Sequence, residues 1–317
     1  MNPPVISVRR VCDIISPMRR SSPKGIILLL LTALIWGISF VAQSVGSDVL
    51  EPFAYNGIRT FMGAVVLAVF ILVTEYSKNR SFKKLVNRKL LLHGTILGLV
   101  FTFASNFQQF AFNDSSAGKI AFITALYMFF VPVIGIFLRR RIHPVTWICV
   151  FAAVIGLYLL SVKDGDFTNI NKGDILALIC AFFFAVHILL IDKFVAESDG
   201  VKLSCIQFAV AGVITLVLMF IFEHPTAHDV KLAAVPLLYS GIMSCGVAYT
   251  LQMVGQKYTN PVTASLLMCL ESVFAVLSAA LLIKEIPTLR EGIGCVVIFA
   301  AIIVSQIVEF RFRNKSC

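Results

Sequence analysis

Ten long apolar segments, separated by short polar connections, run through the chain. Each is close to the ~20 apolar residues that an α-helix needs to cross a bilayer. The pattern predicts membrane-spanning helices at residues 25–46, 52–74, 91–112, 116–138, 143–162, 174–192, 203–222, 232–254, 262–283 and 287–308. None of the connections is long enough to hold a soluble domain. We therefore expect an all-α integral membrane protein.

The ten segments fall into two sets of five that resemble each other. Lys24-Gly25 opens the first segment as Lys172-Gly173 opens the sixth, and Gln109 in the third matches Gln252 in the eighth. Chance similarity between apolar sequences is the alternative to a duplication. Because five is odd, the second set would enter the membrane from the opposite side, which is the inverted-repeat architecture of many secondary transporters.

The boundaries of this duplication follow from the spans. We expect a first five-helix repeat at residues 25–162 and a second at residues 163–308. Short tails, residues 1–24 and 309–317, flank them. Met18 offers an alternative start to Met1. The first apolar run has full span length and lacks an obvious small-residue cleavage site, so it reads as a retained helix.

Composition and charge support a membrane protein and give it an orientation. The chain is 58% hydrophobic and 14% charged, with a net charge of +10, whereas a soluble domain has about 25% charged residues. With the N-terminus inside, 20 Lys and Arg fall in cytoplasmic segments and six, Lys119 among them, in outer segments. This positive-inside bias predicts that both termini are cytoplasmic. The basic loop 78–89 then faces anionic lipid rather than nucleic acid.

The cysteines carry no sign of a metal centre. Six of the eight lie inside expected spans, and Cys12 and Cys317 lie in the tails. No pair has the spacing of metal ligands, and buried thiols usually act as small hydrophobes. We expect no metal, no disulfide and no cofactor.

The stretch Leu251–Gly294, LQMVGQKYTNPVTASLLMCLESVFAVLSAALLIKEIPTLREGIG, resembles the EamA-type branch of the drug/metabolite transporter superfamily. The segments LLTALIWGISFVAQ at 31–44 and SSAGKIAFITALYMFFVPVIG at 115–135 are similar to its first and fourth helices. The resemblance covers residues 25–308 and implies ten transmembrane helices with both termini inside. One departure is Glu271-Ser272, where the family usually has Glu-Pro. Since Pro132 stays in span 4, we expect a kink there and a weaker kink, or none, in span 9.

Of the charged side chains, only Glu271 and Arg59 are expected inside a span. At 1.5 Å per residue, Glu271 lies about 14 Å deep, near the centre of the hydrocarbon core. Such groups face a cavity or a partner and are often functional. Glu271 either binds protons or cationic substrate groups, or caps a helix or locks a gate. Arg59 attracts an anionic group, pairs with Glu271, or extends to the outer interface.

Other polar and aromatic side chains within spans are candidates for the substrate pathway. They are Trp36, Asn106, Gln109, Tyr127, Tyr249 and Gln252. His187 is the second candidate proton site, after Glu271, because imidazole titrates near neutral pH. Helix packing and interhelical hydrogen bonding are the alternatives for all of them.

These features predict a secondary active transporter in the cell (plasma or inner) membrane. It would export a small polar metabolite such as an amino acid, with protons as the expected coupling ion. The sequence has no G-x-x-x-x-G-K-[ST] motif for nucleotide binding. A channel or facilitator is the alternative. A membrane-embedded enzyme needs grouped catalytic residues, which the spans do not supply. The sequence leaves open whether the protein is a monomer or a homodimer.

Overall fold

Every regular element that the computed structural model describes is a helix. It describes residues 21–76, 86–115, 117–140, 142–161, 170–282, 284 and 287–315. Most of the basic loop 78–89, Met18, Cys12 and Cys317 lie outside these residues. In chain order the elements are α2 (Pro23–Ser47), α3 (Pro52–Ile71), η1 (Leu72–Tyr76), α6 (Arg88–Ala111), α7 (Ala117–Ala125), α8 (Tyr127–Phe137), α9 (Pro144–Ser161), α10 (Lys172–Phe194), α11 (Gly200–Phe222), α12 (Ala227–Leu232), α13 (Ala234–Leu238), η2 (Tyr239–Ala248), α14 (Tyr249–Gln256), α15 (Pro261–Met268), α16 (Leu270–Leu282) and α17 (Leu289–Lys315).

The helices coincide with the expected spans. Within the described residues, nine helical stretches are long and apolar enough to cross a membrane, and Pro144–Leu160 is a shorter apolar helix. Helix α9, which contains it, has 18 residues, or about 27 Å at 1.5 Å per residue. The all-α membrane fold is therefore confirmed. The count of ten spans and the cytoplasmic placement of both termini stay predictions.

Local sequence signals set where several helices begin. Three helices begin with a proline: α3 with Pro52, α9 with Pro144 and α15 with Pro261. At the first helical position the missing N–H of proline removes no helical hydrogen bond. Asn171 caps α10 through a reciprocal capping box with Asp174. The polar connections thus end one helix and start the next within a few residues.

A carboxylate from another helix completes the start of α3. Glu223, just beyond α11, accepts hydrogen bonds from the N–H groups of Phe53 at 2.9 Å and Ala54 at 2.6 Å. Burial raises the pKa of Glu223, although these two hydrogen bonds act in the opposite direction. A negative group at a helix N-terminus is stabilising, so Glu223 ties α11 to α3.

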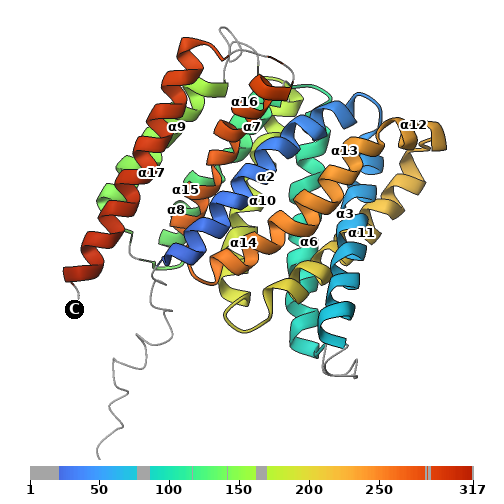
Figure 1. The fold of residues 1–317 in the computed structure, drawn as a ribbon, viewed down its shortest axis with the longest axis horizontal. Coiled ribbons are helices and arrows are strands. Elements are labelled where there is room, and N and C mark those ends of the chain that lie inside the picture. Colours follow the sequence, from blue (N-terminus) through green and yellow to red (C-terminus); the bar gives the residue numbers. More distant parts are fainter. Residues whose placement is uncertain are drawn as a thin grey trace, which may run out of the picture.

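The two halves interlock (Figure 1). Helix α3 packs along α11 on one side of the bundle, and α9 packs along α17 on the other. Between these pairs, α2 contacts η2 and α14, and also α16. In the same way α10 contacts α6, and also α7 and α8. The main contacts of the first expected span thus have counterparts made by the sixth.

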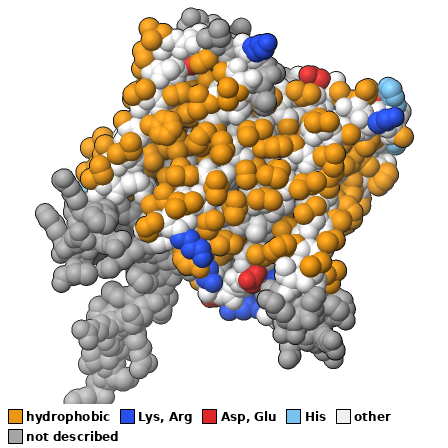
Figure 2. All heavy atoms as spheres, in the orientation of Figure 1, with side chains coloured by type: hydrophobic (Ala, Val, Ile, Leu, Met, Phe, Trp, Pro, Cys, Tyr) orange, Lys and Arg blue, Asp and Glu red, His pale blue; other side chains and the backbone are white. Residues whose placement is uncertain are grey.

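Large apolar side chains cover the surface of the bundle. Figure 2 shows them across the middle of one face, with charged side chains near its upper and lower ends. Exposed members include Phe137, Phe220, Leu281 and Val296. An apolar surface of this extent would be unstable in water and matches the hydrocarbon core of a bilayer.

The start of α2 packs closely against the turn between α14 and α15. The backbone N–H of Ser22 donates to the carbonyl oxygen of Tyr258 at 2.8 Å. A Cβ added at Gly25 would lie 3.0 Å from the carbonyl oxygen of Gly255. Glycine at this position lets the two backbones approach each other.

The start of α10 makes the corresponding contact with the turn between α6 and α7. The Asn171 side-chain N–H donates to the carbonyl oxygen of Asp114 at 2.6 Å. A Cβ added at Gly173 would lie 2.7 Å from the carbonyl oxygen of Ala111. Five spans separate the starts of α2 and α10, and Figure 1 shows them at opposite ends of the bundle.

The second junction contains a buried ion pair. Lys119 Nζ lies 2.7 Å from Asp174 Oδ2, and the two side chains are 5% and 6% exposed. Ser115 donates a further hydrogen bond to Asp174 at 2.7 Å. The assignment of Lys119 to an outer connection was therefore wrong. So was the expectation that Glu271 and Arg59 are the only charged residues inside the helices.

Both central helices that the sequence singled out are interrupted. In span 4 the break is at Leu126. Its N–H donates to the carbonyl of Ile123, three residues back, instead of that of Phe122, four residues back. Pro132 lies within α8, beyond the break, so the kink at Pro132 stays a prediction. In span 9 the break is at Cys269, where the sequence has no proline; the expected difference in kink between the two spans stays a prediction. Cys269 Sγ donates to the carbonyl of Leu266 at 2.9 Å, and such back-bonding competes with the helix ladder.

Gly37 allows α2 to touch α16 at the level of this break. A Cβ at Gly37 would lie 2.6 Å from Phe274 Cβ and 2.8 Å from the carbonyl oxygen of Glu271. We expect Gly37→Ala to lower the free energy of unfolding in detergent by about 1–3 kcal/mol, the usual effect of overpacking. Thermal unfolding of the purified protein measures it. Gly292→Ala is the matched control, because no atom lies within 4 Å of that position. An equal loss in both variants would contradict the assignment.

Candidate functional site

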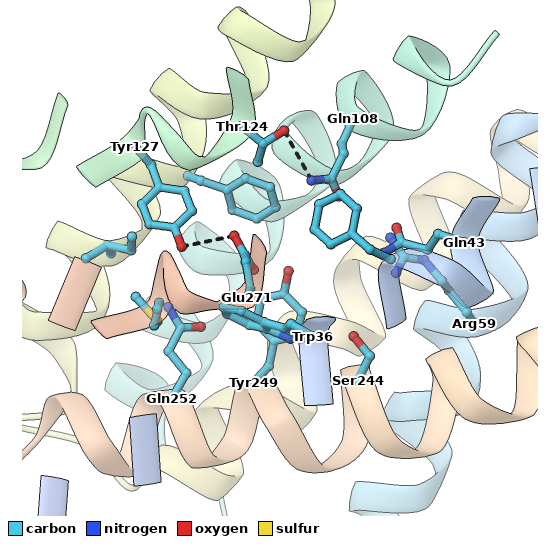
Figure 3. Close-up of a pocket in the computed structure, with 14 residues that line it drawn as sticks. Trp36, Gln43, Arg59, Gln108, Thr124, Tyr127, Ser244, Tyr249, Gln252 and Glu271 are labelled. Atoms are coloured by element: carbon cyan, nitrogen blue, oxygen red, sulfur yellow. Dashed lines mark hydrogen bonds between the residues drawn. The ribbon is translucent and has the colours of Figure 1, made fainter. Parts of the chain in front are cut away.

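A cavity lies at the centre of the bundle, between the interrupted helices and α2 (Figure 3). Spans from both halves contribute to its wall. Its lining residues are Trp36, Phe40, Gln43, Arg59, Gln108, Thr124, Tyr127, Phe184, Ile188, Ser244, Tyr249, Gln252, Met268 and Glu271. Helices α9, α11 and α17 contribute none of them. The site therefore belongs to the inner helices, and the outer ones face lipid.

The free space in this conformation is small. The cavity volume is about 30 Å³, which is the space of a water molecule or two. The lining side chains must move apart before a metabolite can enter. The structure thus describes a closed form of the site.

Glu271 forms the acidic side of the cavity. It lies at the start of α16, directly after the break at Cys269, and is 4% exposed. Tyr127, at the start of α8 after the other break, donates a hydrogen bond from its hydroxyl to Glu271 Oε1 at 3.0 Å. The two interruptions therefore bring a carboxylate and a phenol together from opposite halves.

Arg59 lies on another wall and does not pair with Glu271. The guanidinium is only 3% exposed, so it does not extend to the membrane interface. Its Nε donates to Asn56 Oδ1 at 3.0 Å, and its plane lies near the Tyr55 ring, 5.8 Å from the centroid. Among the described residues no ion pair includes Arg59 or Glu271. The cavity thus separates one positive from one negative group.

Several buried polar atoms around the cavity lack a hydrogen-bond partner among the described residues. They are Trp36 Nε1, Gln43 Oε1 and Gln252 Oε1, and their side chains are 9%, 4% and 2% exposed. Figure 3 shows Gln43 beside Arg59, and Gln252 on the side of Glu271. Leaving such groups unpaired is unfavourable. These atoms are therefore ready to bond a ligand or water.

Aromatic rings and a widened helix shape the rest of the wall. The rings of Trp36 and Tyr249 are 4.6 Å apart. Tyr249 follows η2, a π-helical stretch that carries Ser244 into the wall. π-helical turns occur frequently at functional sites.

Six of the eight side chains that the sequence proposed for the substrate pathway line the cavity, namely Glu271, Arg59, Trp36, Tyr127, Tyr249 and Gln252. Gln109 does not line the cavity; its Nε2 donates to Ser47 Oγ at 2.7 Å, between α6 and α2. Of the matched pair Gln109 and Gln252, Gln252 therefore lines the cavity and Gln109 does not.

Asn106 and His187 also lie away from the cavity wall. Asn106 is part of a buried hydrogen-bond network with Asn56 and Thr215. His187 is fully buried, and its Nε2 lies 2.7 Å from Gln207 Oε1. The ring of His187 is surrounded by aromatic side chains. Its role as a proton site stays a prediction.

The sequence interpretation missed part of the site. Gln43, Thr124 and Ser244 line the cavity, and Thr124 Oγ1 accepts a hydrogen bond at 3.4 Å from Gln108 Nε2, which is also in the wall. Gln43 is a large amide inside an apolar span, which is a usable signal. Thr124 and Ser244 give no such signal, because small hydroxyl residues are common in membrane helices.

Known proteins share this sequence pattern and fold. An "Uncharacterized transporter" of Archaeoglobus fulgidus is 28% identical over 279 residues, which cover 87% of this chain and 83% of the relative. The "Uncharacterized transporter YoaV" of Bacillus subtilis is 23% identical, with 89% and 95% covered. A solved structure titled "Crystal structure of protein" has a TM-score of 0.75 over 92% of this chain and 99% of that chain. At 18% identity it shows the fold alone.

The family match extends over both halves of the molecule. The model of the EamA-like transporter family matches residues 23–162 and again residues 171–306. These ranges contain every helix that lines the cavity. The chain therefore belongs to the EamA-like transporter family, and it is a membrane transporter.

Proposed function

We propose that the protein is a secondary active transporter that exports a small polar metabolite, an amino acid in particular, by alternating access around the central cavity. The observation that carries this proposal is the pair of unneutralised charges on separate walls of the cavity. Arg59 suits a carboxylate, and Glu271 suits an ammonium group. An α-amino acid presents both.

The unpartnered atoms fit the same kind of substrate. Gln43 Oε1 and Gln252 Oε1 accept hydrogen bonds, and Trp36 Nε1 donates one. Sites with buried polar groups reject ligands that leave those groups unpaired. The wall also contains Phe40, Phe184 and Met268, against which an apolar side chain can pack.

The corresponding junctions at the two ends of the bundle support alternating access. The start of α2 closes against the turn before α15, and the start of α10 closes against the turn before α7. Opening one junction while the other stays closed would expose the cavity to one side at a time. The small volume of the closed cavity requires such a motion.

Glu271 is the proposed site of proton coupling. It is buried at the centre of the molecule and hydrogen-bonded to Tyr127 across the two breaks. Substrate and proton would then compete for one carboxylate. This arrangement would exchange a proton for a substrate, bound through its ammonium group, across the cell (plasma or inner) membrane.

Transport by the purified full chain in proteoliposomes tests the proposal. Vesicles loaded with a mixture of the twenty amino acids would receive the same mixture in radiolabelled form, and chromatography would identify what enters. We expect saturable uptake of a subset, accelerated by amino acid inside. Absence of uptake for all twenty would overturn the amino-acid assignment.

A facilitator or channel is the second candidate function, because the fold alone does not define coupling. A channel would give flux that neither saturates nor accelerates with substrate on the far side. The same vesicles, with and without internal amino acid, distinguish the two.

A further inference from the structure

Arg59 is held by a neutral side chain, although a buried guanidinium is usually paired with a carboxylate. Asn56, one turn earlier on α3, is fully buried, and its Oδ1 accepts from Arg59 Nε at 3.0 Å. Tyr55 lies near the guanidinium, but its hydroxyl bonds to Ser240 Oγ at 2.7 Å. The positive charge is thus oriented without being neutralised.

Asn56 is itself fixed by a chain of hydrogen bonds that crosses three helices. Because arginine only donates, Asn56 Oδ1 must face Arg59 and Nδ2 must face the other way. Asn56 Nδ2 donates to Ser105 Oγ at 3.0 Å and to Asn106 Oδ1 at 2.8 Å, both on α6. Asn106 Nδ2 donates in turn to Thr215 Oγ1 at 3.0 Å on α11.

Every link of this chain is buried and has one consistent direction. The side chains of Ser105, Asn106 and Thr215 are 1%, 8% and 1% exposed. This chain of hydrogen bonds leaves the Asn56 side chain no alternative orientation. Asn56 therefore accepts the hydrogen bond from the Nε–H of Arg59. The four N–H bonds on the terminal nitrogens of Arg59 have no partner among the described residues. Figure 3 shows the end of Arg59 beside Gln43, in the cavity wall.

We propose that Asn56 is the positioning residue that makes Arg59 a carboxylate site, and that it thereby decides the preference of the cavity for an amino acid over the amine that lacks its carboxylate. This inference rests on the proposed function and adds a specificity-determining residue to it. Asn56 acts through Arg59 and does not line the cavity.

The isosteric variant Asn56→Asp tests this assignment. The new carboxylate keeps the hydrogen bond from Arg59 Nε but neutralises the guanidinium. We expect the Kd for L-leucine and L-phenylalanine to rise at least about tenfold, the value of one charge-assisted hydrogen bond. The Kd for isopentylamine and 2-phenylethylamine, which carry no carboxylate, should stay within twofold. Equilibrium binding of the radiolabelled compounds to the purified full chain measures all four.

Controls separate positioning from a structural role. Asn113→Asp adds the same charge at an exposed turn and should leave the four Kd values unchanged. If Asn56→Asp does not reach the membrane, Asn56→Ser removes the tether in a smaller side chain and should show the same selective loss for the amino acids.

Two results would overturn the inference. Amino acids and amines that weaken together would show that Asn56 only supports the fold, and unchanged amino-acid affinity would show that Arg59 needs no positioning. If the wild-type protein binds neither L-leucine nor L-phenylalanine, that result contradicts the proposed amino-acid substrate, and with it this role for Asn56.

Discussion

Replacement of Glu271 by glutamine should reduce proton-driven transport at least tenfold while the protein still reaches the membrane. Glutamine has nearly the same size and still accepts the hydrogen bond that Tyr127 donates at 3.0 Å. It cannot carry a charge or exchange a proton. The loss of one charge-assisted interaction alone corresponds to about 1.5–3 kcal/mol, or tenfold and more in rate.

Two modes of flux in the same proteoliposomes separate the possible roles of Glu271. If it couples protons, Glu271→Gln loses uptake driven by a pH gradient but retains exchange of labelled for unlabelled amino acid. If it binds the substrate ammonium or locks a gate, both modes fall. Glu51→Gln is the matched control, because Glu51 is exposed and makes no side-chain cap. Wild-type flux with unchanged pH dependence in Glu271→Gln would remove Glu271 from the mechanism.

Loss of one partner of the Lys119–Asp174 pair should strongly destabilise the protein. Lys119 Nζ and Asp174 Oδ2 are 2.7 Å apart, and both side chains are about as buried as the apolar core. Lys119→Met leaves Asp174 as an uncompensated buried charge, which among the described residues keeps hydrogen bonds from Ser115 and Asn171. We expect the free energy of unfolding to fall by about 3–5 kcal/mol. Chemical unfolding of the purified variant in detergent measures it.

The chain supplies its own comparison for this prediction. Lys89 and Glu197 form a pair of similar length, 2.9 Å, with side chains 57% and 46% exposed. Lys89→Met should change stability by no more than about 1 kcal/mol, because water already screens an exposed pair. The double variant Lys119→Met/Asp174→Asn should recover much of the loss. Equal effects of Lys119→Met and Lys89→Met would show that burial does not strengthen the inner pair.

The contrast between the two junctions has a consequence for gating. The junction at α10 contains an ion pair, and the junction at α2 contains the hydrogen bond from Ser22 to Tyr258 and the Lys24 ammonium over the Tyr258 ring. Separating a buried ion pair requires that both charges be solvated again. Opening the junction at α10 therefore carries this additional cost.

Some site residues could be recognised from the sequence and others could not. Glu271 and Arg59 were identifiable because a charge inside an apolar segment is unfavourable unless it faces a cavity or a partner. Trp36, Tyr127, Tyr249 and Gln252 were identifiable as polar or amphipathic side chains within the spans. Thr124 and Ser244 were not, since their small hydroxyls occur throughout membrane helices.

Two features of the helices were not anticipated. Lys119 was assigned to an outer connection, whereas it lies in α7 and pairs with Asp174, which lies far away in the sequence. At Cys269 a helix is interrupted without a proline, and the Cys269 thiol donates to the Leu266 carbonyl there. Both features depend on contacts between or within helices that hydropathy does not encode.

The sequence by itself determined the membrane class, the positions of the helices and the resemblance between halves. These follow from local hydropathy and from backbone hydrogen bonding, which in lipid must be satisfied within each helix. Only the tertiary structure decided which polar side chains share a cavity, that Arg59 and Glu271 do not pair, and that Asn56 holds Arg59. These relations depend on which helix faces lie together, and packing between distant segments sets that. Hydropathy alone does not.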